Sequence, residues 1–271
     1  MKKAVLFTLS MLLLVTLVFS LSLIFSDLNK YNADRFSELS ILDRLYDIDS
    51  SLQNSIKKVF NAYSGIITDI NKLNVTIQES LPNANKNQFN EKINSFKNYT
   101  ESQFNNIKLD IDQLNNNAEL IINGISYNHN NNFGGNIINI VPKQINFDTY
   151  YFRFYSSAKN GIINWPTAPS GNLRVIIVAD APEWHNEKIQ NIDPSKTTTA
   201  TISGIGIDNI ELIFSNLGKV KIENKAAADV SLKTAIAFNS LNDKIHVYLP
   251  NIINIAFSQF NISKLGHVKI V

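Results

Sequence analysis

The first 81 residues contain a long uncharged stretch and almost nothing that would interrupt a helix. Residues 4–26 carry no charged side chain, and residues 1–81 contain no proline and a single glycine, Gly65. A helix over residues 4–26 would be about 35 Å long, enough to cross the roughly 30 Å hydrocarbon core of a bilayer. We therefore expect residues 1–26 to form a transmembrane anchor.

Charges on either side of this stretch predict its orientation. Lys2 and Lys3 precede it and Asp27 follows it. Because basic flanks favour the cytoplasmic side, we expect a single-pass protein of the cell membrane with a cytoplasmic N-terminus and an extracellular C-terminal domain. A cleaved secretory signal is the alternative, but such signals have shorter apolar regions that end in small residues, whereas residues 23–26 read Leu-Ile-Phe-Ser.

Charge and cysteine content exclude several classes of function. The sequence has 25 basic and 23 acidic residues and no cysteine. A nucleic-acid partner would require a clustered basic face, so none is expected. Without cysteine there can be no disulfide, no thiolate metal site and no cysteine nucleophile.

Two later segments have the spacing of a helical hairpin. Residues 45–81 and 86–122 both lack proline and carry apolar residues at helical spacing, and Pro82 ends the first segment because proline disfavours a helical conformation in the residue before it. We expect these segments to pack antiparallel as a coiled-coil-like stalk within residues 27–123, either as a spacer or as a partner-binding coiled coil. The seam positions are Leu45, Leu52, Val59, Ile66 and Leu73 in one row and Ile56, Tyr63, Ile70 and Ile77 in the other.

The apolar period changes to two after a polar linker. Residues 124–135 are polar, contain glycine and have no period, which is typical of a linker. Short β-rich runs follow, and they predict an α+β fold class with a C-terminal all-β sandwich over residues 136–271. The candidate strands are 137–141, 144–156, 173–179, 197–202, 210–214, 219–223, 230–238, 244–249, 253–260 and 267–271.

No known catalytic motif is present. The sequence lacks a nucleophile elbow, a phosphate-binding loop, a dinucleotide fingerprint and a His-Glu-x-x-His pattern. We therefore expect no enzyme, no catalytic residues and no cofactor.

The densest polar cluster comprises Asp180, Glu183, His185 and Glu187, with Asp193 downstream. Its spacing matches no defined metal-binding loop, so we expect a solvated loop and no metal. Calcium or a transition metal is the alternative. An anchored hydrolase would require these acids to converge with another loop in a deep pocket.

An aromatic run supplies the candidate contact face. Residues 150–155 read Tyr-Tyr-Phe-Arg-Phe-Tyr, and in a strand the odd-numbered positions share one face. Tyrosine and arginine are enriched at binding surfaces. The alternative, which aromatic residues favour because they are also good strand formers, is a face covered by a neighbouring loop or by the helical hairpin. The candidate contact residues are Tyr151, Arg153, Tyr155, Trp165 and Trp184.

The start of the chain resembles a known family. Lys2-Lys3-Ala4, followed by a long apolar helix that continues into an amphipathic one, is similar to the N-terminal module of type IV pilins and of archaeal pilin-like surface proteins. The resemblance is confined to residues 1–60 and implies processing after Ala4, although the acid that many pilins carry five residues later is Leu9 here. It also implies a surface protein for assembly or adhesion, with contacts to membrane lipid, to further copies or to other surface proteins. A stalked carbohydrate- or protein-binding module is the alternative.

Overall fold

The computed structural model describes most of the chain. The described residues are 2–104, 107–109, 119–129, 136–157, 161–166, 170–204, 207–225, 229–239, 244–257 and 262–271, with the side chains of residues 2–15 and a few others left out. The chain divides into two compact units, Met1–Ser50 and Ser51–Val271. The class is α+β, as expected from the sequence.

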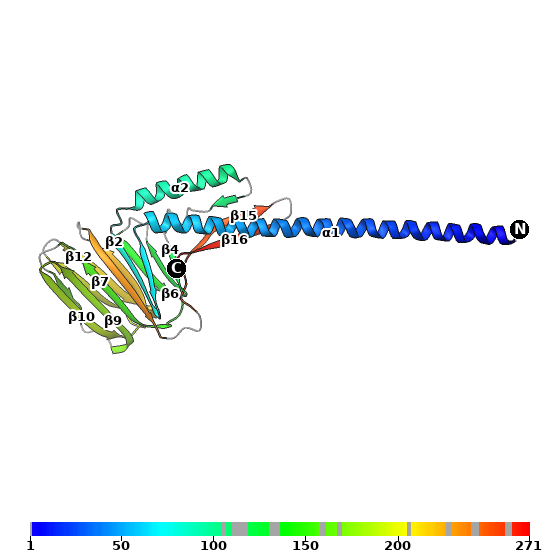
Figure 1. Cartoon of the computed structure of the whole chain (residues 1–271). Helices are drawn as coiled ribbons and strands as arrows, with labels where there is room; N and C mark the ends of the chain where they lie inside the picture. The colour runs from blue at the N-terminus through cyan, green and yellow to red at the C-terminus, as the bar shows by residue number, and fades with distance from the viewer. Residues whose placement is uncertain are drawn as a thin grey trace. The chain divides into compact units, whose positions relative to one another are not determined.

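Helix α1 (Lys2–Tyr63) is continuous (Figure 1). This confirms a helix over the apolar N-terminal region, where neither proline nor glycine interrupts the hydrogen-bond ladder. No helix in the described part of the chain combines the length and apolar character needed to cross a membrane. For most residues of the expected anchor, residues 1–26, the side chains are outside the described part of the chain.

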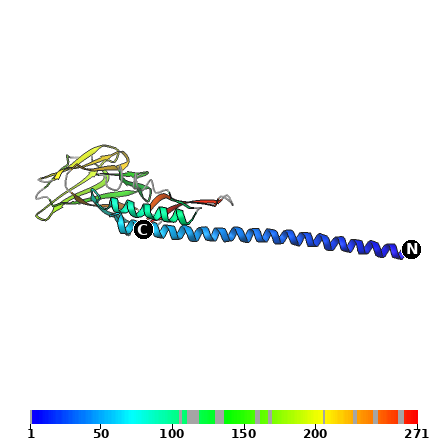
Figure 2. The same ribbon diagram turned by 90° about the horizontal axis from the view of Figure 1, so that it is seen from above.

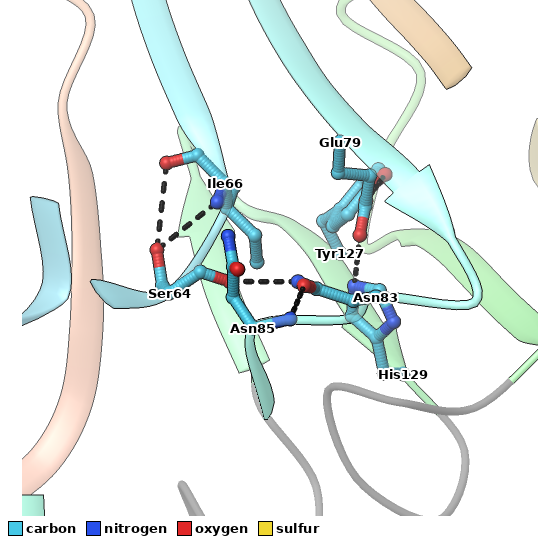
Figure 3. Close-up of polar contacts among 7 residues, drawn as sticks. All are labelled: Ser64, Ile66, Glu79, Asn83, Asn85, Tyr127 and His129. Atoms are coloured by element: carbon cyan, nitrogen blue, oxygen red, sulfur yellow. Dashed lines mark hydrogen bonds and ion pairs between the residues drawn. The ribbon is translucent and has the colours of Figure 1, made fainter. Parts of the chain in front are cut away.

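The end of α1 is held by a small polar network (Figure 3). Gly65, with a φ of +70°, takes the left-handed conformation that commonly terminates helices. The side-chain amide of Asn83 donates to the carbonyl of Ser64 over 2.7 Å, and its oxygen accepts from the backbone N–H of Asn85 over 3.0 Å. These bonds tie the last turn of α1 to the segment that begins the next helix.

Helix α2 (Lys86–Gln103) lies beside the C-terminal turns of α1 in both views (Figure 1 and Figure 2). The rings of Phe60 and Phe89 meet edge to face at 6.1 Å, and both side chains are fully buried. Lys92 Nζ lies 5.7 Å from the centre of the Tyr63 ring. This apolar contact anchors α2 within the second unit.

The predicted antiparallel hairpin of residues 45–81 and 86–122 is wrong. Residues beyond Gly65 form strands β1 (Ile67–Asn71) and β2 (Asn74–Leu81). The second segment leaves the helical state after α2 and contains β3 (Ile107–Leu109) and β4 (Glu119–Ile122), while residues 110–118 lie outside the description. In β2 the buried positions alternate with period two, and its valine, threonine and isoleucine favour a strand.

The expected linker over residues 124–135 is also wrong in its first half. Strand β5 (Ile125–His129) pairs with β4 through a two-residue turn, with Ile122 opposite Ile125. Asn123 and Gly124 have φ values of 45° and 83°, and positive φ at both positions is the geometry of the tight hairpin turn that Asn-Gly favours. Residues 130–135 lie outside the description.

Two sheets are formed by the described residues of the second unit. A six-stranded sheet has the order β1-β2-β14-β7-β9-β10, and all its pairs are antiparallel except β7 with β9. A ten-stranded sheet has the order β16-β15-β4-β5-β6-β13-β12-β11-β8, with β3 beside β15. The remaining strands are β6 (Ile137–Pro142), β7 (Phe147–Tyr155), β8 (Ile162–Asn164), β9 (Ser170–Ala181), β10 (Trp184–Ile192), β11 (Thr198–Gly204), β12 (Ile207–Ser215), β13 (Lys219–Asn224), β14 (Val230–Phe238), β15 (Val247–Phe257) and β16 (Ile262–Lys269), with a short 3-10 turn, η1 (Asn216–Gly218).

The buried faces of the two sheets contact each other. The ring of Phe152 on β7 lies 6.1 Å from that of Phe214 on β12, and both are fully buried. The side-chain amide of Asn224 on β13 donates to the carbonyl of Leu81 on β2 over 2.9 Å. The core of the unit therefore lies between the sheets, which leaves the opposite face of the six-stranded sheet available to carry polar side chains.

Candidate functional site

The outer face of the six-stranded sheet carries part of the predicted contact face. On β7 the even-numbered Tyr150, Phe152 and Phe154 are buried, whereas Arg153 and Tyr155 are exposed and Tyr151 is half-buried. Strand β7 lies between β14 and β9, so its outward side chains stand in the middle of the sheet. The alternation read from residues 150–155 thus describes the strand correctly.

A shallow hollow of ≈ 360 Å³ opens on this face. Strand register explains how it forms: Gln78 on β2 is opposite Lys233 on β14, and Lys233 is opposite Arg153 on β7. Two residues further along these strands, Ser231 on β14 is opposite Tyr155 on β7. Directly opposed residues share one face of a sheet, so these five side chains converge and line the hollow.

An ion-pair chain borders the hollow on β9 and β10. Arg153 Nε donates to Asp180 Oδ2 over 2.5 Å, and His185 Nδ1 lies 2.5 Å from the other carboxylate oxygen. Beyond it, His185 Nε2 lies 3.8 Å from Glu187 Oε2. Asp180 is nearly buried, and the chain of contacts keeps the guanidinium of Arg153 over the sheet.

Both members of the Arg153–Asp180 pair have shifted pKa values. Burial by itself raises the pKa of Asp180, but the hydrogen bonds from His185 and Arg153, together with their charges, outweigh it and lower that pKa. The hydrogen bond to Asp180 raises the pKa of Arg153 above its ordinary value. The aspartate is therefore held as a carboxylate and the arginine as a cation.

The expected solvated loop around Asp180 is instead a hairpin. Asp180 belongs to β9, His185 and Glu187 belong to β10, and Glu183 lies in the turn between them. Asp193 follows β10 and accepts hydrogen bonds from the backbone and hydroxyl of the nearby Ser195. Among the described residues, no three or more histidines and acids form a group that could hold a metal ion.

The two tryptophans of the predicted contact face lie elsewhere. Trp165 is only 8% exposed, and its ring stacks on Phe214 at 5.5 Å. Trp184 opens β10 and precedes His185, so its side chain lies on the sheet face opposite His185 and against Gly161. The structure brings Arg153 and Tyr155 into the hollow, places Tyr151 next to them on β7, and leaves both tryptophans out.

Three residues of the hollow were missed from the sequence. Gln78 falls in the segment expected to be helical, and Ser231 and Lys233 fall in a strand whose neighbours the sequence does not specify. The alternation of Lys233 with buried Leu232 and Thr234 is a usable signal for an outward position.

A second polar cluster is enclosed between the sheets (Figure 3). Tyr127 on β5 donates its hydroxyl to Glu79 Oε1 on β2, and His129 Nε2 lies 2.9 Å from Glu79 Oε2. Burial, followed by the charge of Glu79, raises the pKa of Tyr127 well above its ordinary value. All three side chains are almost fully buried, so the cluster joins the two sheets and is not open to a ligand.

No family model matches the chain, no curated protein matches its sequence, and no solved structure matches its fold.

Proposed function

We propose that this chain is a membrane-anchored, externally displayed, pilin-like structural protein of the cell surface that acts in assembly or adhesion. The observation that carries the proposal is the exposed apolar surface of α1. Large apolar residues are exposed at Val18, Phe19, Leu23, Ile24 and Phe25, between 54% and 66% of each. Spaced at 100° per residue, they point to all sides of the helix, which favours an apolar environment all round.

Lipid and neighbouring helices are the environments that satisfy such a helix. In a bilayer, helices associate by close packing and by hydrogen bonds between small polar residues. The hydroxyl of Ser20 donates to the carbonyl of Thr16 over 2.8 Å, so this serine adds no unsatisfied polar group to the apolar surface. The uncharged sequence of residues 4–26 extends the same character toward the N-terminus.

Fractionation of native membranes tests the anchor. The double variant Leu14→Arg and Leu17→Arg should release the protein from the membrane into the soluble fraction, because both positions lie near the centre of the expected anchor, where each arginine costs about 2.5–3.5 kcal/mol on insertion scales. The control is Leu39→Arg, an exposed apolar position on α1 beyond the predicted anchor. Recovery of the unaltered protein in the soluble extracellular fraction, with a new N-terminus near Asp27, would contradict the proposal.

The alternative, a stalked carbohydrate- or protein-binding module, is favoured by the hollow on the six-stranded sheet. The hollow brings polar and aromatic side chains from β2, β7 and β14 together at one place. An anchored hydrolase has no comparable support, because Asp180 is engaged by Arg153 and His185 instead of facing a deep pocket.

A further inference from the structure

The hollow on the outer face of the six-stranded sheet contains an excess of positive charge. Its two charged lining residues, Arg153 and Lys233, are cross-strand neighbours. Like charges directly opposite each other destabilise a sheet unless an anion offsets them. Asp180 offsets Arg153, whereas Lys233 makes no ion pair within the described part of the chain.

The donors available for an anion are arranged side by side. Arg153 uses Nε for Asp180, and its two terminal amino groups take no part in that bond. A guanidinium and an ammonium on adjacent strands can together hold one carboxylate, since charge-assisted hydrogen bonds of this kind are among the strongest that proteins form. The cationic pair therefore favours a ligand with a single carboxylate.

The rest of the lining favours a sugar as the carrier of that carboxylate. The amide of Gln78 and the hydroxyls of Ser231 and Tyr155 both donate and accept hydrogen bonds, which suits a ligand bearing several hydroxyl groups. The Tyr155 side chain is 49% exposed and offers an apolar ring face beside these polar groups. A pyranose ring presents the matching combination of one apolar face and many hydroxyls.

The place of the hollow in the sheet disfavours an extended peptide or a nucleic acid. Strands β2, β14 and β7 are each paired on both sides, so no backbone edge is open for strand addition at this point. Two cations are also far fewer than a phosphate backbone would require. The ligand must therefore be compact and be recognised by side chains.

We propose that the hollow lined by Gln78, Arg153, Tyr155, Ser231 and Lys233 binds a carboxylate-bearing saccharide, such as a uronic-acid unit. The carboxylate lies between Lys233 and the terminal amino groups of Arg153, and the sugar ring lies on Tyr155. This inference rests on the binding-module alternative and is independent of the membrane anchor.

Titration calorimetry on the full-length chain in detergent tests the proposal with matched probes. The first probe is a disaccharide containing one glucuronic acid, and the second is the same disaccharide with that carboxylate converted to its methyl ester. We expect the acid to bind at least tenfold more tightly than the ester, and added salt to weaken the acid's binding. Equal affinities, or no binding of either probe at millimolar concentration, would overturn the proposal.

Variants locate the site. Lys233→Gln should weaken binding of the acid about 10- to 100-fold, the loss expected for one charge-assisted hydrogen bond. Lys188→Gln, an exposed lysine of β10 that does not line the hollow, should leave the affinity unchanged. Tyr155→Ala should weaken the binding of the acid and of the ester to the same extent, because the ring contacts the sugar and not the carboxylate. Equal effects of the two lysine variants would place the binding elsewhere.

Two further measurements separate the outcomes. Melting temperatures that are not lowered in Lys233→Gln and Tyr155→Ala, both on the outer face, are required for a local effect, and Lys233→Gln should raise its melting temperature slightly because it removes the repulsion with Arg153. If one variant unfolds, binding by the other variant decides. A short peptide of aspartate and glutamate that binds more tightly than the disaccharide would overturn the sugar assignment in favour of an acidic protein partner. The arginine variants of α1 should bind the disaccharide normally, so failure of the anchor and failure of this site are distinguishable.

Discussion

Replacing Tyr127 by phenylalanine removes one hydroxyl group from the enclosed cluster between the sheets and preserves the ring. This hydroxyl donates to Glu79 Oε1, and the Tyr127 side chain is fully buried. Because burial and the charge of Glu79 raise the pKa of Tyr127 well above 10, the phenol keeps its proton at neutral pH and remains a donor. Losing a hydrogen bond to a charged group costs about 1.5–3 kcal/mol, and we expect Tyr127→Phe to destabilise the protein by that amount.

Tyr150→Phe is the matched control for this substitution. Tyr150 is also fully buried, but its hydroxyl donates to the backbone carbonyl of Gly218 over 3.0 Å, which is a neutral acceptor. We expect its removal to cost about 0.5–1.5 kcal/mol. The two variants lose the same atom from the same kind of environment, so the difference between their costs measures the contribution of the carboxylate.

Urea unfolding of the full-length chain, followed by tryptophan fluorescence and circular dichroism, provides the assay. With an m-value of about 1–3 kcal/mol/M, the Tyr127→Phe midpoint should fall by about 1 M relative to wild type. Combining it with Glu79→Gln should give a coupling free energy of about 1 kcal/mol or more. A cost for Tyr127→Phe no greater than that for Tyr150→Phe, or strictly additive single changes, would refute a charge-assisted bond in the core.

Two further changes test the hairpin that borders the hollow. Gly171→Ala would place a Cβ atom 2.2 Å from the carbonyl oxygen of Ile192, so it should displace the β9–β10 pairing. We expect the free energy of unfolding to fall by about 1–3 kcal/mol and the melting temperature to fall with it. An unchanged melting temperature would argue against this close approach. The lowered pKa of Asp180 means that its stabilisation is present above the unfolded value of about 3.9 and is lost as pH falls through the lower folded value. Melting between pH 5 and pH 2 should therefore show a smaller acid-side loss for Asp180→Asn than for wild type, and parallel curves would contradict the assignment.

Local sequence patterns predicted those elements whose period was unambiguous. The N-terminal helix, free of proline and glycine, and the alternation of residues 150–155 both appear in the structure. Several later strands were also anticipated in position, for example 230–238 as β14 and 219–223 within β13. Strands β8 and β10 were not expected, and the two expected strands 244–249 and 253–260 are replaced by a single strand, β15.

The helical-hairpin prediction for residues 45–81 and 86–122 failed because local turn signals interrupt the spacing of seven residues on which it was based. Gly65 terminates α1, and Asn123-Gly124 is one of the strongest short-range indications of a β-hairpin. Both turn signals lie within or next to the segments expected to be helix or linker. The alternation of Val75, Ile77 and Leu81, all buried, is the period-two pattern that should have been preferred.

The candidate site could be predicted only in part, because it depends on which strands are neighbours. Arg153 and Tyr155 follow from the alternation along one strand. Their association with Lys233 and Gln78 depends on β14 lying between β7 and β2, and no local pattern specifies that order. The pairing of Glu79 with His129 has the same origin, since it crosses from one sheet to the other.

Strand β2 contributes one residue to the enclosed cluster and another to the hollow. Its inward side chain Glu79 is satisfied by Tyr127 and His129 of the opposite sheet, while its outward Gln78 lines the hollow. Strand β2 is interior because β14, from near the end of the chain, pairs along its whole length. The hollow therefore depends on β14, which supplies Ser231 and Lys233 to its lining. An unpaired Glu79 in the core would cost several kcal/mol, so strands that bring the wrong partner to β2 are penalised by that buried charge. Glu79 thus favours the packing of β2 against β5 of the opposite sheet, while the pairing of β2 with β14 creates the hollow on the other face.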